Sequence, residues 1–216
     1  MREDNLNQPS LLRSSFREMM KGVCTSIPGH VLTFDAARQI AQIQVGVSRV
    51  DINGAEFNVP PIIEVPVCFP GDGATLEFKV QNGCEGVILF SQRCIDGWLQ
   101  GGGIAPNPIG RFHDMQDAMF IPGIRSKPNA ITDFANDGIR MRSEAGDVYV
   151  WIKDDKTVSI ENGSGTFNML PSGEVQINGV RITIDGDVIT SDGISLRTHR
   201  HIGVTAGNQT SGIPTV

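Results

Sequence analysis

Two histidines separated by a single residue are the side chains whose type and spacing point most directly to chemistry. His199 and His201 lie in the segment RTHRHIGV, and the 216-residue chain has only four histidines. In an extended strand, residues i and i+2 project to the same side, so the two imidazoles would point together. Neutral imidazoles that face one way form part of a site for a transition metal.

One copy of the chain cannot complete such a site. His30 and His113 lie far back in the sequence, and no Cys, Asp or Glu follows Asp192. A metal-dependent enzyme of the cupin type also begins with HxH, but it needs a downstream glutamate and a third histidine, which are missing here. Three copies meeting on a threefold axis would supply six nitrogen ligands, which suit octahedral iron better than four-coordinate zinc. We therefore expect one iron ion per trimer, held by His199 and His201 of each chain; the alternative is an exposed strand end that binds metal adventitiously.

The stretch before the histidines must position them. From about residue 130 onward, strands of four to seven residues alternate with turns at short, regular intervals. The turn residues are Gly146, Asp154–Asp155, Asn162–Gly163, Ser172–Gly173, Asn178–Gly179, Asp185–Gly186 and Asp192–Gly193. Each strand has one apolar face of modest Val and Ile side chains, which a single chain of this length cannot easily bury alone. We therefore expect an intertwined triple-stranded β-helix in a homotrimer; a small β-sandwich is the alternative.

The last apolar residues before the histidines indicate which positions of the chain face the interior. They are even-numbered and are expected to face the interior: Ile182, Ile184, Val188, Ile194 and Leu196. His199 and His201 are odd-numbered, so an unbroken strand would place them outside. The sequence therefore predicts a bulge or a bend between Leu196 and His199.

The first half of the chain has a different pattern. Residues 10–22 show apolar residues at helical spacing and predict one short amphipathic helix. Residues 26–125 contain about five strands broken by PGDG, NGCEG and GGG, which suits a small OB-fold barrel. The four cysteines fit no zinc or redox motif, so buried reduced thiols are favoured, with a Cys84–Cys94 bridge as the alternative.

Composition limits the possible partners. The formal net charge is −6, aromatic residues make up 6%, and no basic block stands out, which argues against nucleic acid as a partner. An OB-fold module that binds nucleic acid or glycans remains an alternative function. The N-terminal residues lack the apolar run of a signal peptide, and no run approaches the length of a spanning helix.

Three features together resemble a known family. They are the barrel segments GDGATLEFKVQNGCEGVILFSQRCIDGWLQGGG and GRFHDMQDAMFIPG, the turn-punctuated stretch that follows, and the THRH near the end. The chain resembles the central spike of contractile-tailed bacteriophages, of the phage baseplate assembly protein V type. The chain departs from the pattern in having 15 residues after His201, so the tail must turn back along the apex.

The resemblance implies an all-β homotrimer, a structural protein of the virion and not an enzyme. It would be made in the host cytoplasm, dock on the baseplate hub at the end of the tail tube, and pierce the host outer membrane when the sheath contracts. The expected segments are an N-terminal helix or arm at 1–25, an OB-fold domain at 26–125, a tapering trimeric β-helix at 126–190 and a metal-bound apex at 191–216.

Overall fold

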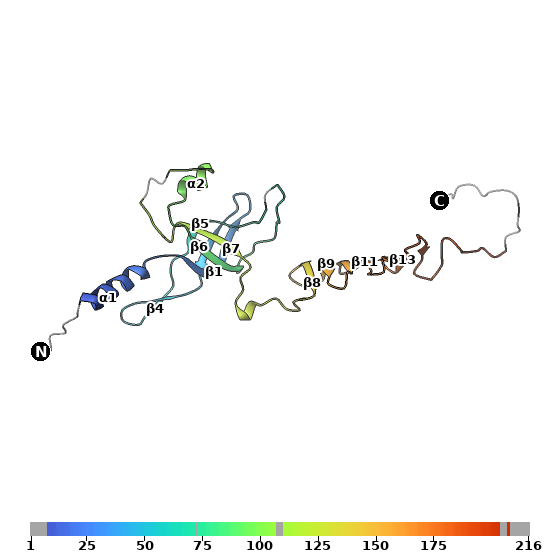
Figure 1. Cartoon of the computed structure of the whole chain (residues 1–216), viewed down its shortest axis with the longest axis horizontal. Coiled ribbons are helices and arrows are strands. Elements are labelled where there is room, and N and C mark those ends of the chain that lie inside the picture. Colours follow the sequence, from blue (N-terminus) through green and yellow to red (C-terminus); the bar gives the residue numbers. More distant parts are fainter. Residues whose placement is uncertain (1–7, 72, 107–109, 204–206, 208–216) are drawn as a thin grey trace. The chain divides into compact units, whose positions relative to one another are not determined.

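The computed structural model describes residues 8–71, 73–106, 110–203 and 207. The chain divides into two compact units, Met1–Ala130 and Ile131–Val216. The predicted boundary lay five residues earlier, before the 3-10 turn Lys127–Asn129. Both units are built mainly from strands, so the all-β class is confirmed (Figure 1). No helix among the described residues has the length and apolar character needed to cross a bilayer.

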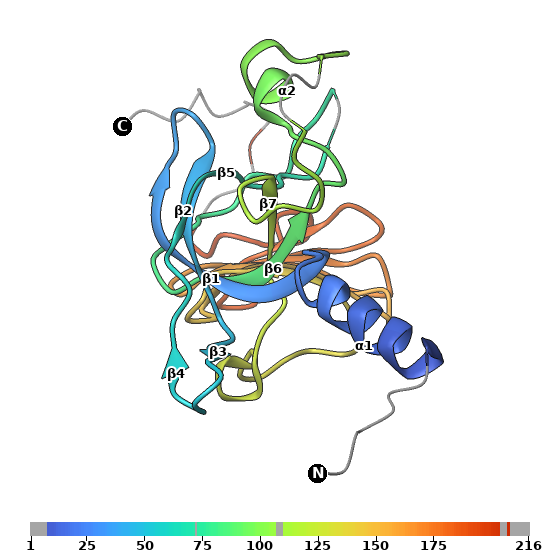
Figure 2. The same cartoon turned by 90° about the vertical axis from the view of Figure 1, so that its left-hand side faces the viewer.

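The first unit is a curled five-stranded sheet in the order β5-β2-β1-β6-β7 (Figure 2). Its strands are β1 (Ser26–Asp35), β2 (Ile40–Val45), β5 (Ile62–Pro66), β6 (Glu85–Phe90) and β7 (Ala118–Pro122). The edge strands β5 and β7 meet through a parallel bridge between Val67 and Phe120, and the Cys68 N–H donates to the Phe120 carbonyl at 2.9 Å. The sheet thus curls until its edges join, as expected for the small barrel predicted from the sequence.

The barrel has a small apolar core. Val31, Ile43, Ile88 and Phe120 are fully buried at its centre. A side chain at Gly86 would come within 2.5 Å of the Phe120 ring, so only glycine lets this aromatic ring pack against β6. The barrel is therefore self-contained: its apolar strand faces are buried within one copy of the chain.

Three further elements belong to the first unit. Helix α1 (Gln8–Lys21) matches the predicted helix to within two residues at its start. Helix α2 (Asp96–Gly101) and the hairpin of β3 (Arg49–Val50) and β4 (Glu56–Phe57) were not predicted from the sequence. Helix α2 has only six residues and ends in glycine, and β3 and β4 have two residues each. Such short elements show no helical or strand period of apolar residues.

The second unit is one antiparallel sheet in which each strand pairs with the next in sequence. Its strands are β8 (Gly138–Arg142), β9 (Val148–Lys153), β10 (Val158–Asn162), β11 (Thr166–Met169), β12 (Val175–Ile177), β13 (Val180–Ile182) and β14 (Val188–Ile189). The predicted turns are all present. Asn178 and Gly179 both have positive φ, 49° and 88°, which is the two-residue turn that an Asn-Gly pair favours.

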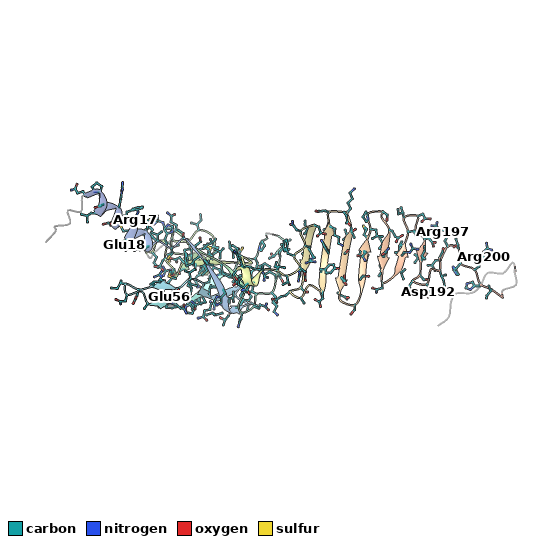
Figure 3. All side chains as sticks on the ribbon, turned by 90° about the horizontal axis from the view of Figure 1, so that it is seen from below. Arg17, Glu18, Glu56, Asp192, Arg197 and Arg200 are labelled. Atoms are coloured by element: carbon teal, nitrogen blue, oxygen red, sulfur yellow. The ribbon has the colours of Figure 1, made fainter. Side chains whose placement is uncertain are left out.

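The strands shorten steadily along this sheet. From β9 onward they contain six, five, four, three, three and two residues. Figure 3 shows the resulting ladder, with Arg197 and Arg200 beyond its narrow end. The sheet of a single chain therefore narrows toward β14.

Candidate functional site

One face of the second-unit sheet is apolar from end to end. The strand registers place these side chains on it: Ile139, Met141, Val148, Val150, Ile152, Val158, Ile160, Phe167, Met169, Val175, Ile177, Val180, Ile182 and Val188. The only polar side chain in register with them is Asn162, at the end of β10. The sequence predicted one apolar face for each strand, and the registers align these faces on one side of the sheet.

This apolar face is uncovered within one chain. The exposed fractions are 71% for Ile139, 52% for Ile152 and 45% for Ile160, although all three lie in regular strands. Monomeric proteins rarely expose contiguous apolar patches of this extent, and a single-layer sheet needs a second layer to bury its apolar face. The apolar face of the second unit thus has no second layer over it among the described residues.

The opposite face is polar. A row of directly opposed residues crosses it: Arg140, Trp151, Ser159, Asn168, Gln176 and Arg181. The Trp151 ring lies 5.0 Å from the Arg140 guanidinium and 4.3 Å from Lys153 Nζ, both measured to its centroid. These cation–π contacts cover the large aromatic side chain, so this face is suited to solvent.

The two histidines lie beyond the narrow end of this sheet, after a turn. Ser195 still pairs with Ile189, but residues 196–198 turn and the His199 N–H donates to the Ser195 carbonyl at 3.0 Å. A bulge or bend between Leu196 and His199 was predicted from the odd-numbered positions of the two histidines, and this turn is that bend. Both histidines are exposed, and their ring centroids lie 5.1 Å apart at an interplanar angle of 81°.

The backbone around His199 selects its tautomer. Nδ1 lies 3.1 Å from the carbonyl oxygens of both Ser195 and Leu196, and carbonyl oxygens only accept hydrogen bonds. In the neutral ring, a hydrogen bond to either carbonyl places the proton on Nδ1 and leaves the lone pair on Nε2. An imidazole held in this way offers Nε2 as a potential donor atom for the expected metal.

A group of hydrogen bonds holds the turn in place. Ser195 Oγ donates to Asp187 Oδ2 at 2.5 Å and accepts from the Thr198 N–H at 3.0 Å. The Arg197 N–H donates to Asp187 Oδ1 at 3.1 Å, and its guanidinium contacts Asp185 Oδ2 at 2.7 Å. The hydrogen bond from Ser195, chiefly, holds the pKa of Asp187 below its usual range. The role of these residues was not predicted from the sequence, because their hydrogen bonds join positions eight to twelve residues apart.

The predicted tail lies mostly outside the described residues. The expectation that residues 202–216 turn back along the apex concerns 204–206 and 208–216, which the structure does not describe. His30 and His113 lie in the first unit, and His113 Nδ1 is 3.1 Å from the Cys24 carbonyl oxygen. His199 and His201 belong to the second unit. All four cysteines are free, so the Cys84–Cys94 bridge is not formed, but the predicted burial is wrong: Cys68 is exposed and the other three are only half-buried.

A second cluster of potential ligands lies in the first unit. Cys94, Asp96 and Asp117 bring ligand atoms within 4.8 Å of one another. Arg111 Nη2 donates to Asp117 Oδ1 at 2.8 Å and to Asp96 Oδ1 at 2.9 Å. It also lies 3.1 Å from Cys94 Sγ. The guanidinium occupies the position that a cation would need, so this cluster is a salt bridge and not a metal site.

The core of that salt bridge is buried. The Asp117 side chain is fully buried, and it also accepts the Ile95 N–H at 3.1 Å. Burial alone would raise the pKa of Asp117, but hydrogen bonds from Arg111 and Ile95 outweigh it and the pKa is lowered. The hydrogen bonds that Arg111 donates to Asp117, chiefly, raise the pKa of Arg111. The pair ties the segment around α2 to the start of β7.

Asp117→Asn is expected to destabilise the first unit by about 3–5 kcal/mol, because it removes one partner of a buried charge pair. Asp96→Asn is the matched control: this carboxylate contacts the same guanidinium but is 51% exposed, so its loss should cost less than about 1 kcal/mol. Urea unfolding followed by circular dichroism measures both. Equal costs for the two variants would contradict the assigned difference in burial.

The same pair predicts a dependence on pH. The pKa of Asp117 is lowered on folding, so its stabilisation is complete above the unfolded pKa of about 3.9 and is lost as the pH falls through the lower folded value. The Asp117→Asn variant should lack this part of the acid sensitivity.

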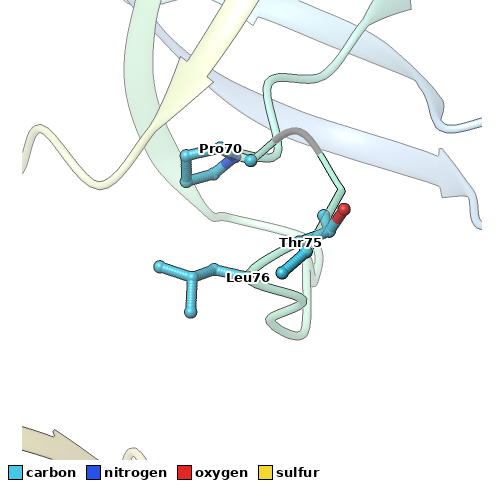
Figure 4. Close-up of a pocket in the computed structure, with 5 residues that line it drawn as sticks. Pro70, Thr75 and Leu76 are labelled. Atoms are coloured by element: carbon cyan, nitrogen blue, oxygen red, sulfur yellow. The ribbon is translucent and has the colours of Figure 1, made fainter.

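A hollow of about 280 Å³ lies on the first unit beside the loop after β5 (Figure 4). Its lining residues are Pro70, Gly71, Ala74, Thr75 and Leu76. None of these side chains is titratable or ligates metals, so the hollow offers an apolar surface and no reactive group.

Comparison with known proteins gives one informative match. Residues 27–123 match the phage protein Gp138 N-terminal domain. The match covers the barrel from β1 to just past the end of β7 and less than half of the chain. It supports a phage structural protein of the baseplate type, associated with the virion. No curated protein matches the chain significantly.

Proposed function

We propose that this chain is the central spike of a contractile phage tail, a homotrimer that pierces the outer membrane of the host when the sheath contracts. The match of the barrel to a phage protein domain supports a structural role in the virion. The observation that carries the finer proposal is the apolar face of the second unit, which is continuous, uncovered, and narrows toward two histidines.

Three copies can bury what one copy leaves exposed. Three sheets with their apolar faces turned to a common axis form a closed prism, and each buried Å² of apolar surface contributes about 25 cal/mol. The strands all pair within their own chain, so each copy supplies one whole wall and no exchange of strands is needed. Because the strands shorten from β9 to β14, the prism narrows toward its end.

At that end His199 and His201 of three chains would hold an iron ion. The free Nε2 of His199 is a suitable donor, and the turn from 196 to 198 directs the chain away from the register of the strands. Two sheets would supply only four imidazoles, whereas three supply the six that an octahedral ion takes. A bound iron ion supplies coordination bonds that join the three chain ends where the strands are shortest.

The barrel is proposed to form the base that docks on the hub at the end of the tail tube. No catalytic role is proposed for any residue. The buried Arg111–Asp117 pair stabilises the barrel. The two histidines would serve only to hold metal. The carboxylate of Asp187, in the adjoining turn, already accepts hydrogen bonds from Ser195 and Arg197 and is not proposed to act as a base. Nucleic acid is not a proposed partner.

The test combines native mass with elemental analysis of the purified chain. A mass of three chains with one iron per three chains is expected. A metal-free monomer would overturn the proposal, and a two-chain assembly would overturn the prism even if metal were present.

A further inference from the structure

Helix α1 has an apolar side that is exposed. None of its residues is buried, and Leu12, Phe16 and Met19 have exposed fractions of 71%, 60% and 66%. Figures 1 and 2 both show the helix clear of the barrel strands. The barrel core is complete without it. Three large side chains on one stripe of a helix call for a partner surface.

The spacing of this stripe indicates what kind of surface. Phe16 follows Leu12 by four residues, Met19 follows by three, and Val23 follows by four, just past the end of the helix. Alternating steps of four and three place these residues at the two seam positions of successive heptads, and the exposed apolar side chains of Leu11 and Met20 lie to the side of this seam. A seam that repeats every seven residues fits another helix of the same kind.

We propose that α1 packs against the α1 helices of two further copies as a short parallel three-helix coil. This inference rests on the proposed trimer. The helix ends at Lys21 and β1 begins at Ser26, so four residues tether each helix to its barrel. Four residues span at most about 14 Å, so three equivalent barrels would hold their helices within reach of one another.

The charges of the helix are compatible with this packing. In a parallel coil, Leu12, Phe16 and Met19 would lie on the seam. Beside the seam, Arg13 of one helix would face Gln8 of the next helix, and Met20 would face Ser15. No like charges are opposed. The remaining charges point outward, where Lys21 and Glu18 form an ion pair at 2.7 Å.

The short length makes the coil dependent on the rest of the trimer. A 14-residue helix is marginal in water on its own, because nucleation is unfavourable and two heptads bury little surface. Tethering removes most of the cost of bringing the helices together. The coil is thus a second, weaker contact between copies, at the opposite end of the chain from the histidines.

Cysteine cross-linking in the full-length chain tests the arrangement. Met19→Cys places a thiol on the seam and Arg17→Cys places one on the outer side, while the unmodified chain, with the same four native cysteines, gives the background. After mild oxidation, we expect disulfide-linked dimers of Met19→Cys, up to two of every three chains, and none above background for Arg17→Cys.

Hydrogen exchange gives an independent readout in the purified protein without any partner. Residues 8–21 should exchange at least about tenfold faster in Phe16→Asp than in the unmodified chain, because the helix loses its packing. Ser14→Asp introduces the same residue on the outer side and should keep the protection.

The outcomes separate this inference from the proposed function. A trimer in which α1 is unprotected and Met19→Cys does not cross-link overturns the coil alone. Protection without cross-linking also overturns it, because the helix then packs on its own barrel. Hydrogen-exchange protection of α1 that appears only when another tail protein is added also overturns the coil. A monomer by native mass overturns the proposed function as well.

Discussion

Removing both His199 and His201 by substitution with alanine is expected to abolish bound iron and to leave the trimer intact. The two imidazoles are the only metal-ligating side chains among residues 193–203, so no other group can take their place. The trimer should persist because the apolar faces of the sheets lie upstream of the turn and do not involve the histidines. Elemental analysis and native mass measure the two results separately.

Arg200→Ala is the matched control for the double histidine variant. Arg200 lies between the two histidines and is exposed, so this variant should keep one iron per three chains. The unmodified protein treated with a chelator should behave as the double variant does. Dissociation of the double variant into monomers would contradict the sheet as the main contact between copies, and retained iron would contradict the site.

A charge on the apolar face of the sheet is expected to prevent assembly. Phe167 lies at the centre of that face, opposite Ile160 and Ile177 on the neighbouring strands. Phe167→Lys would place three ammonium groups near the axis of the prism, each with a desolvation cost on the order of several kcal/mol and no partner. We expect monomers by native mass and sedimentation at micromolar concentration.

Asn168→Lys is the matched control for this variant. Asn168 is the next residue in the same strand and lies on the polar face, opposite Ser159 and Gln176. The same substitution there adds a solvated charge and should leave the trimer unchanged. If both variants assemble, the apolar face is not the contact between copies. If neither assembles, the effect comes from the strand and not from the face.

The sheet of the second unit could be predicted from the sequence because its information is local. Each turn contains residues that favour turns, such as Asn178–Gly179, and most strands place small apolar residues at every second position. Neighbouring strands in the sheet are neighbours in sequence, so no long-range pairing had to be found. Even the bend before His199 followed from counting odd and even positions.

The first unit was less predictable because its decisive contacts join distant residues. Asp117 stands before β7 in a segment that resembles a solvated turn, and nothing nearby indicates that it is fully buried against Arg111. Its burial depends on how the loops around α2 fold over the barrel. The hydrogen bonds of Asp187 with Ser195 and Arg197 escaped prediction for a similar reason, since they join residues eight and ten positions apart.

The connection of each strand to the next has a mechanical consequence. In a meander of this kind the backbone hydrogen bonds run along the ladder, and seven strands at a spacing of about 4.8 Å stack to roughly 29 Å. A compressive load along the ladder presses each strand onto the one below, so it closes the hydrogen bonds. A pulling load opens them one strand at a time, beginning with the two residues of β14. The sheet is therefore built to resist a push in one direction and to yield, from its narrow end, to a pull in the other.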